Sequence, residues 1–246
     1  MTALLQTRGL SLAFGGVVAA DQIDFTLQAG ERLAVIGANG AGKTTFINMV
    51  TGYLSPTAGS VWFDGSNITR MQPRQIVHRG IGRSFQLPQL FLEHTVRESV
   101  QLAVASRGKR LSLFRPLSRC VPADEIEQVL AMVGMLGRAD DLCSSLPEGH
   151  RKLLDIAMAL VLRPKLLIMD EPTSGVAADE KHPLMTTIMK ALDERGVTAM
   201  FVEHDVDIVE RYATRVVAWI YGRIAADGPP EQVMRNDEVR SVVLGH

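Results

Sequence analysis

The chain has 246 residues, of which 46% are hydrophobic and 22% are charged, and its formal net charge is -1. These proportions are those of an ordinary globular protein with one large or two small domains. The near-neutral charge excludes an electrostatic case for nucleic acid or anionic lipid as the main partner. The N-terminal residues lack the basic start of a signal peptide, and no apolar run reaches the roughly 18 residues that span a bilayer. Any membrane role is therefore expected to depend on a partner protein.

Two N-terminal segments, residues 10–14 and 23–27, alternate apolar and polar side chains. This alternation predicts half-buried antiparallel strands, with a turn at Gly15-Gly16 after the first. Phe14, at the end of the first segment, is one of few aromatic residues. It could pack in the core, or it could stack on an adenine ring, as aromatic side chains do with any base.

Residues 37–45 carry the most specific motif. The pattern G-x-x-x-x-G-K-[ST] and the residue after it are Gly37, Ala38, Asn39, Gly40, Ala41, Gly42, Lys43, Thr44 and Thr45. Residues 32–36 predict a buried strand before it, and residues 45–50 predict a helix after it. Such a turn directs backbone N–H groups at one point, where the helix dipole adds positive potential. The motif predicts phosphate binding, with Lys43 on the β- and γ-phosphates and the Thr44 hydroxyl on Mg2+.

The segment after this motif predicts a short helix over residues 73–79 that Gly80 ends. Residues 81–86 predict a strand that leads into a loop at Gln86. The amide of Gln86 could ligate a metal or a water molecule, although a loop glutamine is more often simply solvated.

Residues 87–162 have helical character and no strand pattern. Thr95 and Glu98 form a capping box for the first helix. Pro122 begins a second helix, and a third is expected over about residues 151–162. Five basic residues lie within the stretch 106–121, and they are Arg107, Lys109, Arg110, Arg115 and Arg119. This stretch is either a solvated linker or a contact to a membrane-domain loop or lipid headgroups.

Residues 166–171 form an apolar run that ends in Asp170 and Glu171. The run predicts a strand buried on both faces, and ligands bind at the carboxyl ends of such strands in open parallel sheets. Asp170 is then placed to support Mg2+, and Glu171 to polarise water near the γ-phosphate.

A helix over residues 179–195 and a further buried strand over residues 197–202 follow. His204 comes after that strand. It could be a satisfied polar residue, but its place at the end of a second parallel strand indicates a contact to the γ-phosphate. A hairpin around Gly222 and short helices after Pro229 complete the chain.

The ordered set of the phosphate loop, Gln86, a helical insert, residues 166–171 and His204 resembles the ATP-binding subunit of ABC transporters over nearly the whole chain. Within that superfamily it is most similar to the ATP-binding proteins of branched-chain amino acid importers. The likeness to that subfamily rests on four short segments, which are residues 14–16, 83–86, 202–205 and 243–245.

The resemblance implies an α/β fold in a single domain over residues 1–246. It implies a P-loop NTPase core with a mixed, mostly parallel sheet and an antiparallel β subdomain over residues 1–86 and 163–246, and a helical subdomain over residues 87–162. Two such subunits would close head to tail around two ATP molecules. Membrane permease subunits and, indirectly, a periplasmic solute-binding protein would complete the complex at the cytoplasmic face of the inner membrane.

The resemblance also implies roles for individual residues, and nucleic acid is not an expected partner. Phe14 would stack on adenine, and Lys43 would bind the phosphates. Thr44 and Gln86 would ligate Mg2+, which Asp170 would support through water. Glu171 would be the general base, and His204 would sense the γ-phosphate. Gly149, in the signature segment, would face the ATP of the other subunit.

Two departures from the family pattern are present. The signature Leu-Ser-Gly-Gly-Gln is replaced by residues 146–150, in which Pro147 has neither a hydroxyl nor an N–H and Glu148 adds negative charge. The loop after Glu171 ends in alanine where the family has aspartate, and Asp179 could compensate only if that loop shifts. Either a heterodimer with unequal sites or a subfamily that tolerates a loose signature would account for the first departure.

Three functions are compatible with this pattern. The first is a transport ATPase that energises uptake of an amino acid or a similar small polar solute. The second is the same engine in a lipopolysaccharide-type export complex. The third is a poorly hydrolysing regulatory subunit, which Pro147 and Glu148 favour and which Glu171 and His204 oppose.

Overall fold

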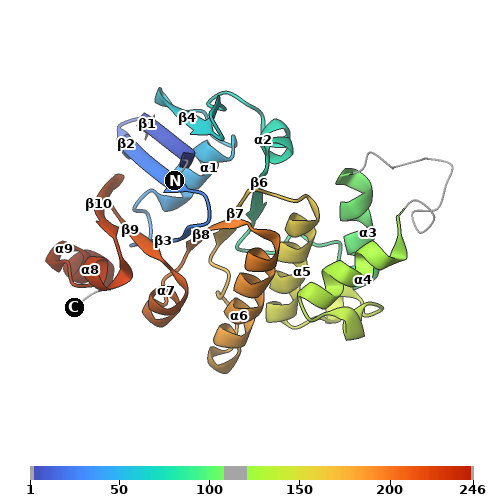
Figure 1. The fold of residues 1–246 in the computed structure, drawn as a ribbon. Coiled ribbons are helices and arrows are strands. Elements are labelled where there is room, and N and C mark those ends of the chain that lie inside the picture. Colours follow the sequence, from blue (N-terminus) through green and yellow to red (C-terminus); the bar gives the residue numbers. More distant parts are fainter. Residues whose placement is uncertain (1–2, 108–120, 245–246) are drawn as a thin grey trace.

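We describe a computed structural model of the chain over residues 3–107 and 121–244. One of its two sheets is antiparallel and has the strand order β2-β1-β4-β5 (Figure 1). Its strands are β1 (Ala3–Phe14), β2 (Val17–Gln28), β4 (Ala58–Phe63) and β5 (Ser66–Asn67). The alternation at the N-terminus thus did predict strands, although β1 and β2 are longer than the segments that showed it.

The second sheet has the strand order β10-β9-β3-β8-β7-β6. It contains β3 (Arg32–Gly37), β6 (Ile81–Ser84), β7 (Leu166–Asp170), β8 (Thr198–Val202), β9 (Arg215–Ile220) and β10 (Arg223–Gly228). Strands β9, β3, β8, β7 and β6 are parallel, and β10 is antiparallel to β9 at the edge. This arrangement confirms the predicted α/β fold with a mixed sheet and a separate antiparallel sheet.

Both faces of the parallel strands are buried, as their continuous apolar sequences predict. On β3, Leu33 and Val35 join the apolar layer under the antiparallel sheet, whereas Ala34 and Ile36 join the layer on the opposite face. Helix α1 (Lys43–Val50) packs in the first layer. The second layer is covered by α6 (Ala178–Arg195), α7 (Val206–Tyr212), α8 (Pro230–Met234) and α9 (Asp237–Val239).

Local sequence signals fix several helix ends. Helix α2 (Pro73–Arg79) ends at Gly80, whose left-handed φ of 108° suits glycine. Before α3 (Val96–Arg107), the Thr95 N–H donates to Glu98 Oε2 (2.8 Å), and the Glu98 N–H donates to Thr95 Oγ1 (3.2 Å). The predicted capping box is therefore confirmed.

Helices α3, α4 (Ala123–Met132) and α5 (Glu148–Val161) pack around an apolar cluster of their own and lie to one side of the sheets (Figure 1). The start predicted for the third helix was wrong. It begins at Glu148 rather than Arg151, because Pro147 is set at the N-cap and an acidic residue stabilises the first turn. Residues 108–120, which hold most of the predicted basic stretch, lie outside the described residues.

Short helical turns complete the described segments, and they are Leu136–Arg138, Cys143–Ser145 and Arg240–Leu244. None of the helices described has both the length and the apolar character that a membrane crossing requires.

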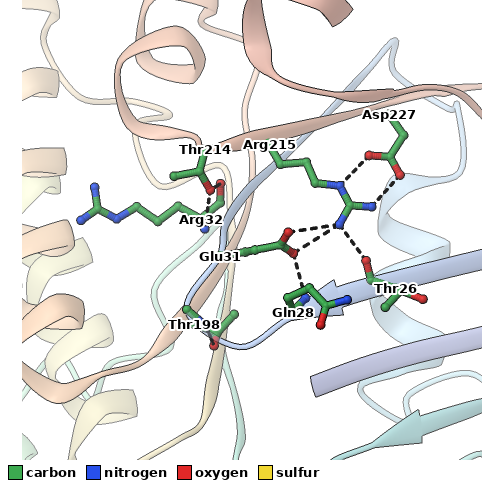
Figure 2. Close-up of polar contacts among 9 residues, drawn as sticks. Thr26, Gln28, Glu31, Arg32, Thr198, Thr214, Arg215 and Asp227 are labelled. Atoms are coloured by element: carbon green, nitrogen blue, oxygen red, sulfur yellow. Dashed lines mark hydrogen bonds and ion pairs between the residues drawn. The ribbon is translucent and has the colours of Figure 1, made fainter. Parts of the chain in front are cut away.

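Arg215, at the start of β9, joins the two sheets at the end opposite the phosphate loop (Figure 2). Its Nη1 donates to the Thr26 carbonyl on β2 (2.8 Å) and to Glu31 Oε2 (3.2 Å). Its Nε and Nη2 each donate to the Asp227 carboxylate on β10 (2.6 Å). The hydrogen bonds that Arg215 donates to the Asp227 carboxylate raise the pKa of Arg215.

We expect Arg215→Met to lower the free energy of unfolding by about 1–3 kcal/mol, because it removes the guanidinium that pairs with Glu31 and Asp227 and donates to the Thr26 carbonyl. Urea denaturation followed by circular dichroism measures this change. Arg235→Met, which removes an exposed guanidinium, is the matched control and should change stability by less than about 0.5 kcal/mol. Equal losses of unfolding free energy for the two substitutions would show that the Arg215 hydrogen bonds do not stabilise the fold more than an exposed arginine does.

Candidate active site

The phosphate loop connects β3 to α1, as the sequence predicts. Gly42 is the N-cap of α1, with a left-handed φ of 107°. A Cβ atom at Gly42 would lie 2.3 Å from the Ala19 carbonyl oxygen on β2, so only glycine fits there. The loop is thus pressed against β2 at Gly42, and the N-terminus of α1 follows directly.

Lys43 is buried within this loop and is 6% exposed. Its Nζ donates to the carbonyls of Gly37 (2.5 Å) and Ala38 (3.1 Å). Burial lowers the pKa of Lys43, and the carboxylates of Glu171 and Asp170 oppose that shift. The ammonium therefore lies at the loop and within the electrostatic reach of both acids that end β7.

A cavity of about 160 Å3 joins the loop to those acids. Its lining includes Ala19 of β2, Val202 of β8, Asp170 and Glu171, together with all loop residues from Asn39 to Thr45. The carboxyl ends of parallel strands meet at one edge of a sheet, and this is why residues far apart in sequence line one cavity.

Glu171 is the centre of the polar contacts at this edge. Its Oε2 accepts a hydrogen bond from Gln86 Nε2 (2.6 Å), and its Oε1 lies 3.2 Å from His204 Nε2. Gln86 follows β6, Glu171 follows β7 and His204 follows β8. Three of the residues singled out in the sequence thus come together through the order of the strands.

Gln86 and His204 contact Glu171 without lining the cavity, and three other singled-out residues do not line it either. Phe14 ends β1 and is 51% exposed, so it is not a core residue. Gly149 is buried in the first turn of α5, on the helical side of the molecule. Asp179 lies in the first turn of α6 and is exposed.

Arg83 is a residue whose contact the sequence analysis missed. It lies on β6, and its Nη2 is 3.3 Å from Asp170 Oδ2. Its Nη1 donates to Asn48 Oδ1 on α1 (2.6 Å), and its guanidinium packs over the Phe85 ring at 4.7 Å. Arg83 therefore orients the Asp170 carboxylate from the neighbouring strand. In the sequence, the one indication of a role for Arg83 was that it lies in the segment 83–86, which ends at Gln86.

Glu203 and Lys152 are two further residues that the sequence analysis did not place. Glu203 is 3% exposed, and its Oε1 accepts hydrogen bonds from the Thr173 N–H (3.0 Å) and hydroxyl (2.7 Å). This fixes the loop after Glu171 to the end of β8. Lys152, on α5, donates to the carbonyls of Gln86 and Glu171. No motif marks either contact, because each joins segments that are distant in sequence.

No group of three or more His, Cys, Asp and Glu side chains that could hold a metal ion occurs in residues 3–107 and 121–244. Mg2+ is commonly bound through one or two protein oxygens together with substrate phosphates. Thr44 and Asp170 line one cavity and supply such oxygens.

The sequence model of the ABC transporter family matches residues 20–174. The chain belongs to the ABC transporter family. It is an ATPase of that family, and it shares nucleotide binding with the other family members.

Curated relatives match nearly the full chain. The chain is 36% identical over 249 residues to the probable branched-chain amino acid transport ATP-binding protein LivG of Archaeoglobus fulgidus, covering 98% of the chain and 95% of the relative. It is 32% identical to the high-affinity branched-chain amino acid transport ATP-binding proteins BraF of Pseudomonas aeruginosa and LivG of Escherichia coli K12, covering 98% of each sequence compared.

Solved structures give the same fold. The ADP conformation of an ATP-binding cassette of an ABC transporter superposes with a TM-score of 0.86 at 29% identity and covers 100% of both chains. A nucleotide-free ATP-binding cassette superposes with a TM-score of 0.84 at 29% identity and covers 97% of both. These matches confirm the ABC ATPase fold.

We expect Gly42→Ala to lower the free energy of unfolding by about 3 kcal/mol or more, because a left-handed φ and a backbone overlap are both violated. Gly40→Ala is the matched control in the same loop. It also has a positive φ, of 80°, but its added Cβ would meet nothing within 4 Å. We expect it to cost only about 1–2 kcal/mol. Urea denaturation distinguishes the two, and equal losses would contradict the packing of the loop against β2.

Proposed function

We propose that this chain is the ATP-hydrolysing subunit of an importer for branched-chain amino acids or a similar small polar solute. The observation that carries the proposal is the cluster of Gln86, Glu171 and His204 beside a complete phosphate loop. The names of the relatives support the cargo class, and they do not favour a lipopolysaccharide-type exporter.

In this proposal the phosphate loop holds ATP through its backbone N–H groups and Lys43. The Lys43 ammonium is already at the loop, and it binds the β- and γ-phosphates. The exposed ring of Phe14 stacks on the adenine. The exposed Thr44 side chain, Gln86 and Asp170 hold Mg2+, Asp170 through a water molecule. When bound, Mg2+ neutralises charge on the phosphates.

Glu171 acts as the general base in this proposal. Its carboxylate is held by Gln86 on one oxygen and lies beside His204 on the other, so its orientation is fixed before a water molecule arrives. His204 contacts the γ-phosphate and reports its presence. Two of the elements involved, the ends of β6 and β8, flank the strand that carries the base.

The chain is proposed to work as one of two ATP-binding subunits, bound to permease subunits at the cytoplasmic face of the inner membrane. A periplasmic solute-binding protein would act indirectly. We infer the division proposed from sequence, with residues 1–86 and 163–246 as the nucleotide-binding core and residues 87–162 as the helical part. The separate apolar cluster of α3, α4 and α5 supports this division.

The signature segment supports a dimer with two unequal sites. Pro147 precedes α5 with φ near -58°, and it has no N–H to offer a phosphate. Glu148, in the first turn, packs beside Gly175 of the same chain, since its Cγ lies 3.5 Å from the ideal Cβ position there. The remaining N–H groups of the first turn and the helix dipole still favour an anion. Gly149 belongs to that turn. The segment is thus weakened rather than abolished, and tolerance of such a signature in a homodimer is the competing explanation.

We expect Glu171→Gln to lower kcat for ATP hydrolysis about 100-fold or more, because the base is lost, while ATP still binds. Phosphate release by the purified chain measures the first quantity, and nucleotide titration measures the second. Glu194→Gln, an exposed carboxylate on α6, is the matched control and should hydrolyse ATP at the parent rate. Hydrolysis by the Glu171→Gln variant at the parent rate would overturn the assigned role.

We expect the double substitution Pro147→Ser and Glu148→Gly to raise ATP hydrolysis about 10-fold in a reconstituted heterodimer with a second ATP-binding subunit. It supplies a hydroxyl donor and removes a negative charge near the phosphate. An unchanged rate, together with equal hydrolysis at the two sites of the parent heterodimer, would contradict unequal sites and favour a tolerant signature.

A further inference from the structure

Lys152 is a buried lysine at the junction of the helical part and the sheet. It lies on α5 and is 2% exposed. A buried ammonium is unfavourable unless it is hydrogen-bonded. Its Nζ donates to the Gln86 carbonyl at 3.0 Å and to the Glu171 carbonyl at 2.9 Å. One side chain of α5 is therefore bonded to the backbone of two different strand ends.

The two carbonyls belong to residues whose side chains also touch. Gln86 Nε2 donates to Glu171 Oε2 at 2.6 Å. Glu171 has a left-handed backbone, with φ near 50°, which a glutamate adopts only when its surroundings hold it there. The hydrogen bond from Lys152 to the Glu171 carbonyl is one of the contacts that hold this turn.

A second side chain of the same helix lies beside the other part of the loop. Asp155 follows Lys152 by one turn on α5 and lines a cavity together with Phe85 and Gln89. Burial raises the pKa of Asp155. Two ionisable side chains of α5 thus lie against this segment, and Lys152 is hydrogen-bonded to it through the Gln86 carbonyl.

We propose that Lys152 is a positioning residue for ATP hydrolysis, which fixes Gln86 and Glu171 relative to helix α5. The proposal rests on the proposed role of Glu171 as the base. Helix α5 begins with the signature segment, and therefore a displacement of that segment would move Lys152 and both carbonyls with it. Through Lys152, the contact between the signature segment and the second subunit thus sets the position of Glu171.

The test compares Lys152→Met, which keeps the aliphatic stem and removes the donors, with Lys152→Arg, which keeps donors and charge. We expect Lys152→Met to lower kcat about 10- to 100-fold with KM for ATP changed less than two-fold, because a misplaced base slows the reaction without weakening binding. Lys152→Arg should restore at least part of kcat. Lys190→Met, on the exposed face of α6, is the matched control and should keep the parent kcat.

Two further measurements separate this role from a structural one. In the Glu171→Gln background, Lys152→Met should lower the remaining rate less than two-fold, since the group that it positions is gone. Hydrogen exchange of residues 85–91 and 171–176 should be faster in Lys152→Met than in the parent, with α6 unchanged. This second readout does not require turnover, so it tests Lys152 even if the chain alone does not hydrolyse ATP.

Specific results would overturn the proposal. The proposal is wrong if Lys152→Met keeps a kcat within two-fold of the parent. It is also wrong if Lys152→Met loses kcat and ATP affinity equally and Lys152→Arg restores neither. If Lys152→Met does not fold, Lys152→Gln takes its place with the same expected split between kcat and KM. If the parent chain shows no Glu171-dependent turnover, that result counts against the proposed function. The hydrogen-exchange comparison still tests whether Lys152 holds the two segments.

Discussion

Four parallel strands end at the same edge of the six-stranded sheet, and the candidate active site depends on that alignment. Val35 of β3 pairs with Val202 of β8, Val202 pairs with Asp170 of β7, and Met169 pairs with Ser84 of β6. The residue or loop that follows each strand therefore emerges beside its neighbours. A slip of one residue in any of these pairings would exchange the two buried faces of that strand, and for this reason the two apolar layers also fix the register.

Charge balance gives the site its second constraint. Lys43 and Lys152 are both buried, and burial lowers the pKa of each. Carboxylates oppose both shifts, and Glu171 is among them in each case. The same residue gives its backbone carbonyl to Lys152. Glu171 is thus held by its main chain as well as by Gln86 on its side chain, which leaves it little freedom to turn away.

Membership of the ABC transporter family explains most of this design, and the departure in the signature segment lies apart from the phosphate loop. The phosphate loop, Asp170, Glu171 and His204 lie on the core. Pro147 and Glu148 lie on the helical part, where α5 begins. The signature segment and the phosphate loop lie on separate elements, and Lys152 of α5 connects the helix to the carbonyls of Gln86 and Glu171.

The sequence by itself determined the local structure. The glycine-rich motif specified a strand, a turn and a helix, because Gly42 adopts a backbone that other residues avoid. Continuous apolar runs specified the buried strands, and Gly80 and the capping box specified helix ends. The sequence also singled out Gln86, Glu171 and His204 by their places after predicted strands, and the strand order brought them together as expected.

Only the tertiary structure decided the contacts that join distant segments. The bond from Arg83 to Asp170, the Glu203 contacts with Thr173 and the Lys152 contacts have no local pattern, because each depends on which strands and helices are neighbours. Periodicity reports the environment of a side chain but not its partner. The start of α5 was also placed too late from the sequence, since the helix begins at Glu148, directly after Pro147 at the N-cap.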